Sequence, residues 1–286
     1  MTTLSRLLGS VRIQYTGFVL GFALALLFLS LSLPAFGKNT RQSSIPAKPS
    51  SDTCANPEAD EFIRRGRKEW PQPGPRTPAV IAAAGMALTY FQLAVEKDPK
   101  CPAAYLSLAQ AYASFPSWPA LPPDERYAKA KAAASKALAL DEGLTAAHVL
   151  LGRAEFDSWH WELAEKEFKR ALQLTPNDTS AHASYARFLA AVGRSEEAIA
   201  EIELARKLAR GSSLNAAAGE IYYWARRYDQ AIELLRPTVE IDPFAYFPLG
   251  WAYVAQSRWP EAIGAFEKLV PLSDRDAGSL MSLAYA

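Results

Sequence analysis

The sequence predicts an all-α protein in which antiparallel helix hairpins stack into a solenoid, and three observations lead to this prediction. Over most of residues 79–274, apolar side chains recur every three or four positions, which is the period of one helix face. An alanine on that face recurs at intervals close to the length of one hairpin. Residues 17–36 form a separate, uncharged and apolar stretch near the N-terminus.

The recurring alanine belongs to the second helix of each predicted hairpin. Its positions lie 43, 34, 34, 33 and 31 residues apart and are Ala87, Ala130, Ala164, Ala198, Ala231 and Ala262. Four residues later comes a set that is bulky at all but one position: Phe91, Ala134, Phe168, Ile202, Leu235 and Phe266. A small residue lets two helices approach closely, and a bulky one fills the gap beside it. A fixed period of this length indicates a repeat array.

The first helices carry a matching pattern, most clearly in the unit at 145–178. There, Leu151-Gly152 stands in the first helix, Ala164 and Phe168 follow in the second, and Pro176 ends it. This pattern resembles the tetratricopeptide repeat, which has a period of 34 residues, Trp-Leu-Gly-Tyr in its first helix and Ala-Phe-Pro in its second. Tyr253 of a later unit matches the Tyr, whereas His148 and His182 stand where the family often has Trp. The resemblance extends from about residue 79 to the C-terminus and implies a right-handed solenoid.

The order of segments follows from these patterns. Residues 1–37 form a basic tail and an apolar segment, and residues 38–60 form a Ser- and Pro-rich linker that we expect to be disordered. Residues 61–286 form the solenoid, beginning with a short helix at 61–70. The expected hairpins span about 79–101, 102–144, 145–178, 179–211, 212–242 and 243–274, with a partial one at 275–286. Because that last helix would expose an apolar face, we expect either that the natural chain continues beyond Ala286, which the pattern favours, or that another molecule covers this end.

The apolar segment at 17–36 is long enough to cross a bilayer as a helix. Arg6 and Arg12 precede it, as in a signal peptide, and Ala35-Phe36-Gly37 fits a cleavage site. The length of the uncharged run favours a single-pass anchor over a signal cleaved near Gly37. A short basic tail usually stays inside the cell. We therefore expect the solenoid to lie outside the cytoplasm, and a cytoplasmic-facing solenoid is the alternative.

Charge and cysteine content narrow the possible partners. The net charge is +1, so no basic field is present to attract nucleic acid, and we expect none to bind. The chain has two cysteines, Cys54 and Cys101, which form no metal-ligand spacing. They would pair in an oxidising compartment and would be free thiols in the cytosol.

No motif in the sequence carries catalytic chemistry. The phosphate-binding, dinucleotide-binding and nucleophile-elbow patterns are all absent from the sequence. His148 and His182 lie one repeat apart in equivalent places, which we interpret as packing within the hairpin. Glu162 with Lys166 and Glu165 with Lys169 have the spacing of helix-surface pairs. We expect no enzymatic activity, no cofactor, no metal and no small-molecule substrate.

The resemblance implies a binding groove. In arrays of this kind the first helices line a concave face that binds peptide segments. Carried over to this sequence, the groove residues suited to contact a partner are Gln110, Arg153, Phe156, Arg187, Glu220, Tyr223, Phe247 and Trp251. Arg153 and Arg187 would be neighbours and would offer donors to a carboxylate. Phe247 and Trp251 would form an aromatic anchor pocket or, equally, pack against a further repeat.

These observations favour a non-enzymatic scaffold that binds a segment of a partner protein in its groove, beside a membrane. The alternative is a regulatory or sensory module of a larger signalling or secretion assembly. Residues 159–172 also resemble the repeat tails of bacterial membrane-bound regulators, although the sequence has no winged-helix or kinase head. A kinase, transcription regulator or secretion component that co-purifies with the protein would favour the alternative.

Overall fold

A computed structural model describes residues 53–71, 77–114, 122–210, 214–272 and 282–285. The apolar segment at 17–36, the possible cleavage site and most of the expected linker lie outside the described residues. So does most of the expected partial hairpin at 275–286. The chain divides into two units after Pro46, and every described residue belongs to the second.

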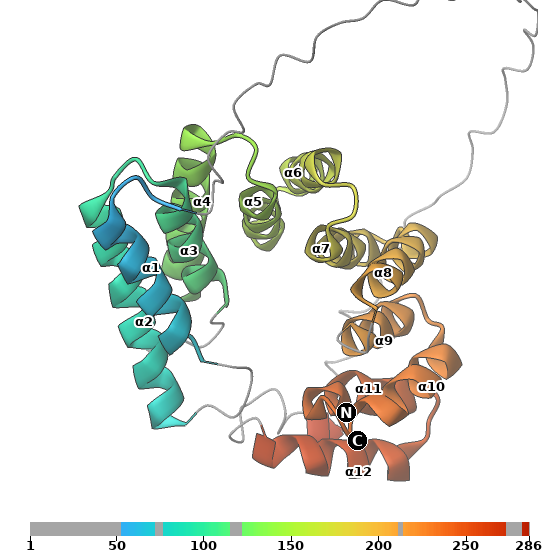
Figure 1. The fold of residues 1–286 in the computed structure, drawn as a ribbon. Helices are drawn as coiled ribbons and strands as arrows, with labels where there is room; N and C mark the ends of the chain where they lie inside the picture. The colour runs from blue at the N-terminus through green and yellow to red at the C-terminus, as the bar shows by residue number, and fades with distance from the viewer. Residues whose placement is uncertain (1–52, 72–76, 115–121, 211–213, 273–281, 286) are drawn as a thin grey trace, which may run out of the picture. The chain divides into compact units, whose positions relative to one another are not determined.

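The described residues form helices that pair as antiparallel hairpins, so the predicted all-helical repeat fold is confirmed (Figure 1). The first helices are α1 (Pro57–Glu69), α3 (Pro102–Ser114), α5 (Thr145–Asp157), α7 (Thr179–Ala191), α9 (Asn215–Trp224) and α11 (Tyr246–Ala255). The second helices are α2 (Pro78–Lys97), α4 (Pro123–Leu140), α6 (Trp161–Leu174), α8 (Ser195–Ala209), α10 (Tyr228–Thr238) and α12 (Trp259–Leu272). A short 3-10 helix, η1 (Pro243–Ala245), leads into α11.

The N-terminal end differs from the expectation, because α1 begins within the expected linker and pairs with α2. Asn56 caps α1 by accepting a hydrogen bond from the backbone N–H of Glu58 at 2.9 Å. Gly66 of α1 lies against the ring of Phe91 in α2. The first hairpin is therefore α1 with α2, rather than a hairpin at 79–101. The predicted boundary of the linker at residue 60 is also wrong, because residues 57–60 belong to α1.

A disulfide between Cys54 and Cys101 fastens α1 to the turn between α2 and α3. The Asn56 side chain adds to this attachment by donating to the carbonyl of Lys97 at 2.9 Å. The backbone N–H of Asn56 also donates to the Asp98 carboxylate at 3.2 Å. The sequence left the pairing of the two cysteines open, and the structure pairs them.

The recurring small and bulky residues meet inside the hairpins that have a glycine in the first helix. A Cβ added to Gly152 of α5 would lie 2.9 Å from the Phe168 ring in α6, and Gly219 and Gly250 face Leu235 and Phe266 in the same way. Phe168 and Phe266 are fully buried. The glycine in the first helix therefore determines how closely its partner helix can approach.

Each hairpin from α5 onward turns through one left-handed residue. These residues are Trp159, Gly193, Arg226 and Ser257, with φ between 58° and 83°. After each one, a backbone N–H returns to the carbonyl five residues earlier, as in Arg194 N–H to the Leu189 carbonyl at 2.8 Å. Glycine adopts this conformation without strain, whereas the other three residues pay about 1 kcal/mol or more.

One helix among the described residues, α2, has the length and mean hydropathy needed to span a membrane. Its face with Ala87, Phe91 and Ala94 is buried, and α2 packs against α1 and α3. These contacts account for the buried face of α2 as packing between repeat helices, while 22% of its membrane-length apolar window is buried in all.

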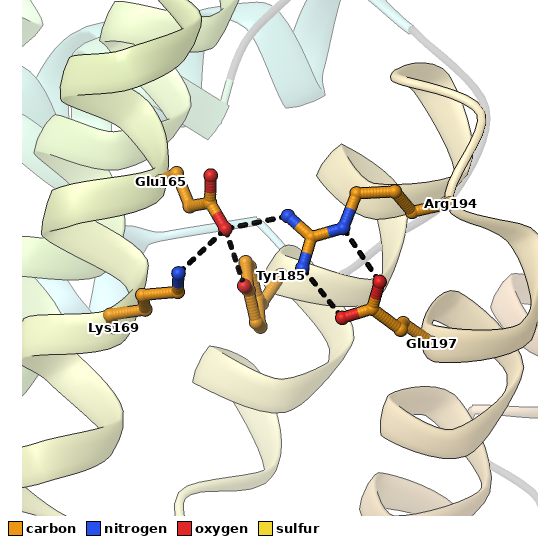
Figure 2. Close-up of polar contacts among 5 residues, drawn as sticks. All are labelled: Glu165, Lys169, Tyr185, Arg194 and Glu197. Atoms are coloured by element: carbon orange, nitrogen blue, oxygen red, sulfur yellow. Dashed lines mark hydrogen bonds and ion pairs between the residues drawn. The ribbon is translucent and has the colours of Figure 1, made fainter. Parts of the chain in front are cut away.

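A polar cluster joins the hairpin α5–α6 to the hairpin α7–α8 (Figure 2). One carboxylate oxygen of Glu165 accepts from Tyr185 at 3.0 Å, Arg194 at 2.6 Å and Lys169 at 2.8 Å. Arg194 also donates to both oxygens of Glu197 at 2.7 and 2.5 Å. The Lys169 and Arg194 hydrogen bonds lower the pKa of Glu165 to about 2. The predicted Glu165–Lys169 pair is confirmed, but the described residues show no ion pair between Glu162 and Lys166.

Candidate functional site

The first helices of successive hairpins contact one another along the array, from α1 to α3 and onward to α11. Among the described residues, second helices of successive hairpins make at most marginal contact with each other. The exposed sides of α3, α5, α7, α9 and α11 therefore form a continuous surface, which we call the first-helix face. Every residue of the predicted groove lies on one of these helices.

Arg153 is the exposed cation of this face in α5, and it forms no hydrogen bond or ion pair with any described residue. The surrounding protein removes part of its hydration and lowers the pKa of Arg153 below its ordinary value. The charge of Arg187 lowers this pKa further, while the charge of Asp157 acts in the opposite direction. An arginine that is partly dehydrated and placed beside a like charge is suited to bind an anion.

Arg187 of α7 is already paired, which the sequence did not predict. Its Nε and one terminal nitrogen donate to the same Glu220 oxygen in α9 at 3.2 and 3.1 Å. The Arg187 side chain remains about half exposed, at 49%. Arg153 and Arg187 are therefore close enough for their charges to interact, as predicted. Of these two arginines, only Arg153 lacks an acceptor among the described residues.

Two of the predicted aromatic groove residues are partly buried by their neighbours. Phe156 packs edge-on against the buried Phe188, with ring centroids 5.9 Å apart, and belongs to the core of the α5–α8 region. Tyr223 packs against Tyr228 at 5.9 Å. Phe156 therefore contributes more to packing between hairpins than to an open groove.

The aromatic residues of α11 differ from each other. Trp251 packs between Phe266 of α12, at 5.7 Å, and Tyr285 in the last described segment, at 5.4 Å. Phe247 is 45% exposed. The sequence left open whether these two residues form an anchor pocket or pack against a further repeat. Trp251 packs against residues that follow it in the chain, whereas Phe247 remains exposed.

At the N-terminal end, the first-helix face leads into a cavity of about 380 Å³. Two predicted groove residues, Gln110 and Arg153, line it together with side chains from α1, α2 and α7. The sequence patterns did not indicate Arg67 of α1, Trp70 at the C-cap of α1 or Ser107 of α3, which also line this cavity. Arg67 and Trp70 were missed because α1 was not recognised as a repeat helix. The one signal for Ser107 was a hydroxyl between Leu106 and Leu108.

The two equivalent histidines make equivalent contacts within their hairpins. His148 Nδ1 lies 2.6 Å from a Glu167 oxygen, and His182 Nδ1 lies 2.5 Å from a Glu201 oxygen. Each Nε2 faces a backbone carbonyl in the preceding turn, at 3.2 Å for His148 and 2.9 Å for His182. Each ring therefore links a first helix, the following second helix and the turn before it.

Comparison with known proteins identifies the repeat. Residues 149–213 and 216–278 match the family model described as tetratricopeptide repeat, so this part of the chain consists of tetratricopeptide repeats. A search of curated proteins returned no match.

Solved structures with the same fold include three that are similar over most of this chain. A chain of the APC/C hetero-tetramer Cut9–Hcn1 superposes with a TM-score of 0.63 at 16% identity, covering 80% of this chain and 43% of that one. A thermophilic TPR protein of Thermus thermophilus gives 0.54 at 18% identity, covering 72% and 98%. A tetratricopeptide repeat protein from Parabacteroides merdae gives 0.57 at 15% identity, covering 80% and 98%. This chain thus spans less than half of the Cut9–Hcn1 chain, and these likenesses concern the fold.

Proposed function

We propose that this protein is a non-enzymatic scaffold whose first-helix face binds a segment of a partner protein. Tetratricopeptide repeats, which the chain contains, form extended surfaces of this kind. The observation that carries the proposal is Arg153, an exposed arginine of this face with no acceptor among the described residues. Keeping a partly dehydrated cation unpaired is unfavourable, and an acidic group on a partner would relieve it.

The partner segment is expected to be acidic in the middle of the face and apolar toward α11. Arg153 supplies the cation, while the paired Arg187 and Glu220 keep donors and acceptors exposed beside it. Phe247 supplies an exposed aromatic surface further along. Exposed aromatic residues and arginines are the residue types that most often contribute binding energy at protein interfaces.

We propose further that the solenoid is held at a membrane by residues 17–36 and lies outside the cytoplasm. The length and charge pattern of that segment support the anchor. The disulfide between Cys54 and Cys101 supports an oxidising compartment, because disulfides seldom persist in the cytosol. The compartment is tested by isolating the intact protein from cells and alkylating its thiols before and after reduction. Cys54 and Cys101 should react only after reduction, and a reaction without reductant would contradict an oxidising compartment.

Charge reversal tests the binding surface. Arg153→Glu should abolish capture of the partner, because the side chain would repel the acidic group it now attracts. The matched control is Arg236→Glu on the second helix α10, where Arg236 is exposed and forms no ion pair with a described residue. Capture is measured as the amount of each co-purifying protein relative to the wild-type chain. An unchanged set of proteins with Arg153→Glu would remove Arg153 from the site.

A further inference from the structure

Most of the tryptophans in this chain lie at one kind of turn. The sequence has seven, and five of them stand where a first helix ends or its second helix begins: Trp70, Trp159, Trp161, Trp224 and Trp259. Because the hairpins are antiparallel and first helices contact first helices, the turns from first to second helices lie along one edge of the array. We call this the tryptophan edge.

Four of these side chains are exposed. Trp159 is 78% exposed, and Trp161, Trp259 and Trp224 are 45, 42 and 40% exposed. The rings of Trp159 and Trp161 lie beside each other, with centroids 6.0 Å apart. None of the four indole N–H groups donates a hydrogen bond to a described residue. An apolar ring with a free N–H suits a boundary that is apolar on one side and wet on the other.

Folding of the hairpins does not require these aromatic residues. Trp161 and Trp259 are each the first residue of a second helix, and Ser195 takes that place in α8. Trp159 has a φ of 63° at the left-handed position of its turn, where the next hairpin has Gly193. Glycine adopts this conformation without strain. The exposed rings are therefore not explained by the packing of the array.

The opposite edge, formed by the turns from second to first helices, is acidic. An aspartate that accepts a backbone N–H lies at four of these turns: Asp98, Asp141, Asp178 and Asp242. The described part of this edge has no tryptophan, and its large exposed apolar side chains, Ile241 and Phe244, are confined to one turn. Carboxylates are stable in water and are repelled by anionic lipid, so the two edges suit different surroundings.

Exposed arginines accompany the tryptophans. Arg226 lies in the α9–α10 turn, donates to the Tyr228 hydroxyl at 3.4 Å and forms no ion pair with a described residue. Arg227 and Arg258 pair with glutamates, yet their side chains remain 47 and 39% exposed. An arginine can lay its apolar stem along a surface while its charged end reaches a phosphate. Tryptophans and arginines together are the side chains expected in the headgroup region of a bilayer.

We propose that the tryptophan edge docks on a lipid bilayer. The rings of Trp159 and Trp161 lie at the boundary between headgroups and acyl chains, and Arg226 contacts lipid phosphates. The inference rests on the proposed placement of the solenoid at a membrane, to which it adds an orientation. The ends of the helices face the lipid, so the first-helix face along their sides stays open to a partner.

The chain between the apolar segment and the solenoid is long enough for this contact. Residues 37–52 can span up to roughly 55 Å when extended. The solenoid begins at the opposite edge, where Cys54 is bonded to Cys101 in the α2–α3 turn. A first helix of 13 residues is about 20 Å long, so the tether can reach past one hairpin.

The test uses the full chain in phosphatidylcholine vesicles, with or without bromine on the upper part of the acyl chains. Residues 1–52 contain no tryptophan, so indole fluorescence reports the solenoid alone. Bromine should quench this fluorescence by roughly a third or more, since four of the seven tryptophans are exposed at this edge. Sedimentation with the vesicles reports the anchor separately. Sedimentation without quenching, the result expected if this edge binds a protein, would overturn the docking and leave the anchor standing, whereas absence of sedimentation would overturn both.

A double variant connects the quenching to the α5–α6 turn. Trp159→Gly with Trp161→Ser copies the residues at the equivalent positions of the α7–α8 hairpin, so the variant should fold and should unfold at close to the wild-type temperature. Bromine quenching should fall by roughly half, because two of the four exposed rings are gone.

The control is Trp251→Phe, since the Trp251 ring packs between two other aromatic rings inside the array. Its loss should leave the fractional quenching at least as large as in the wild type. Unchanged quenching in the double variant, or an equal loss of quenching in Trp251→Phe, would overturn the proposal.

Discussion

Gly152 of α5 faces the ring of Phe168 in α6 so closely that an added Cβ would lie 2.9 Å from it. Phe168 is 1% exposed and is enclosed by Tyr185 and Phe188 of the next hairpin. The ring therefore has no room to move away from a larger side chain at position 152. One pair of residues sets both the spacing within a hairpin and the packing onto its neighbour.

Gly152→Ala should consequently lower the free energy of unfolding by about 1–3 kcal/mol, because overpacking exceeds the helix propensity that alanine gains. The control is Gly264→Ala in α12, where an added Cβ meets nothing within 4 Å. That substitution should raise the free energy of unfolding by up to about 1 kcal/mol. Urea unfolding measures both, and a stabilising effect at position 152 would refute this account of the contact.

His148 and His182 should each contribute to stability through their two hydrogen bonds. Removing either ring by substitution with alanine should cost about 1–3 kcal/mol, because a largely buried side chain is lost and the partly buried carboxylate it contacts loses a partner. His160→Ala is the control, since the His160 side chain is 55% exposed and, among the described residues, forms one hydrogen bond, to Glu155 at 2.8 Å. Chemical denaturation that shows equal losses at all three positions would mean that burial of the ring is unimportant.

The lowered pKa of Glu165 should make the free energy of unfolding fall in acid. Its pKa is about 2 in the folded protein against an ordinary 4.5, so the folded state favours the ionised form. Its stabilisation is complete above pH 4.5 and is lost as the pH falls toward 2. Because the carboxylate is partly exposed, we expect about 1 kcal/mol after screening by solvent.

The measurement is the difference in unfolding free energy between the wild type and Glu165→Gln, followed from about pH 6 to the acid limit of folding. The glutamine variant cannot titrate at this position. A difference that shrinks as the pH falls supports the contribution of Glu165, and a difference independent of pH would contradict it.

The disulfide should matter most for α1. Replacing Cys54 and Cys101 by serine opens a loop defined by a sequence separation of 47, and the chain-entropy model assigns about 4 kcal/mol to such a link. We expect α1 to lose hydrogen-exchange protection while α7 to α10 retain theirs, because each repeat contacts mainly its neighbours. Uniform loss of protection along the array would show that α1 supports all of it.

The sequence was sufficient to predict the repeat because small and bulky residues recur at a nearly fixed period. It failed at α1, where Gly66 lies 21 residues before Ala87, rather than 12, and a proline-rich stretch intervenes. The period therefore gave no sign that Arg67 and Trp70 belong to the array. Spacing also placed Arg153 and Arg187 on one face, but the pairing of Arg187 with Glu220 depends on side-chain geometry between hairpins.

The polar cluster around Glu165 shows the same limit. Its pair with Lys169 has the i, i+4 spacing and could be predicted within one helix. Tyr185 and Arg194 come from the next hairpin and reach Glu165 only once the hairpins stack. The burial of Ser107 similarly results from the packing of α3 within the array, which no local pattern reports.

The central claim, that the first-helix face binds a partner segment, is tested most directly by photocrosslinking in cells. A photoreactive amino acid is placed at Gln110 or Arg187 on this face, and for comparison at Lys207, a residue of the second helix α8. We predict a discrete adduct with the same protein from both face positions, lost when Arg153→Glu is added. Adducts that are equally abundant from Lys207, or that persist with Arg153→Glu, would contradict the claim.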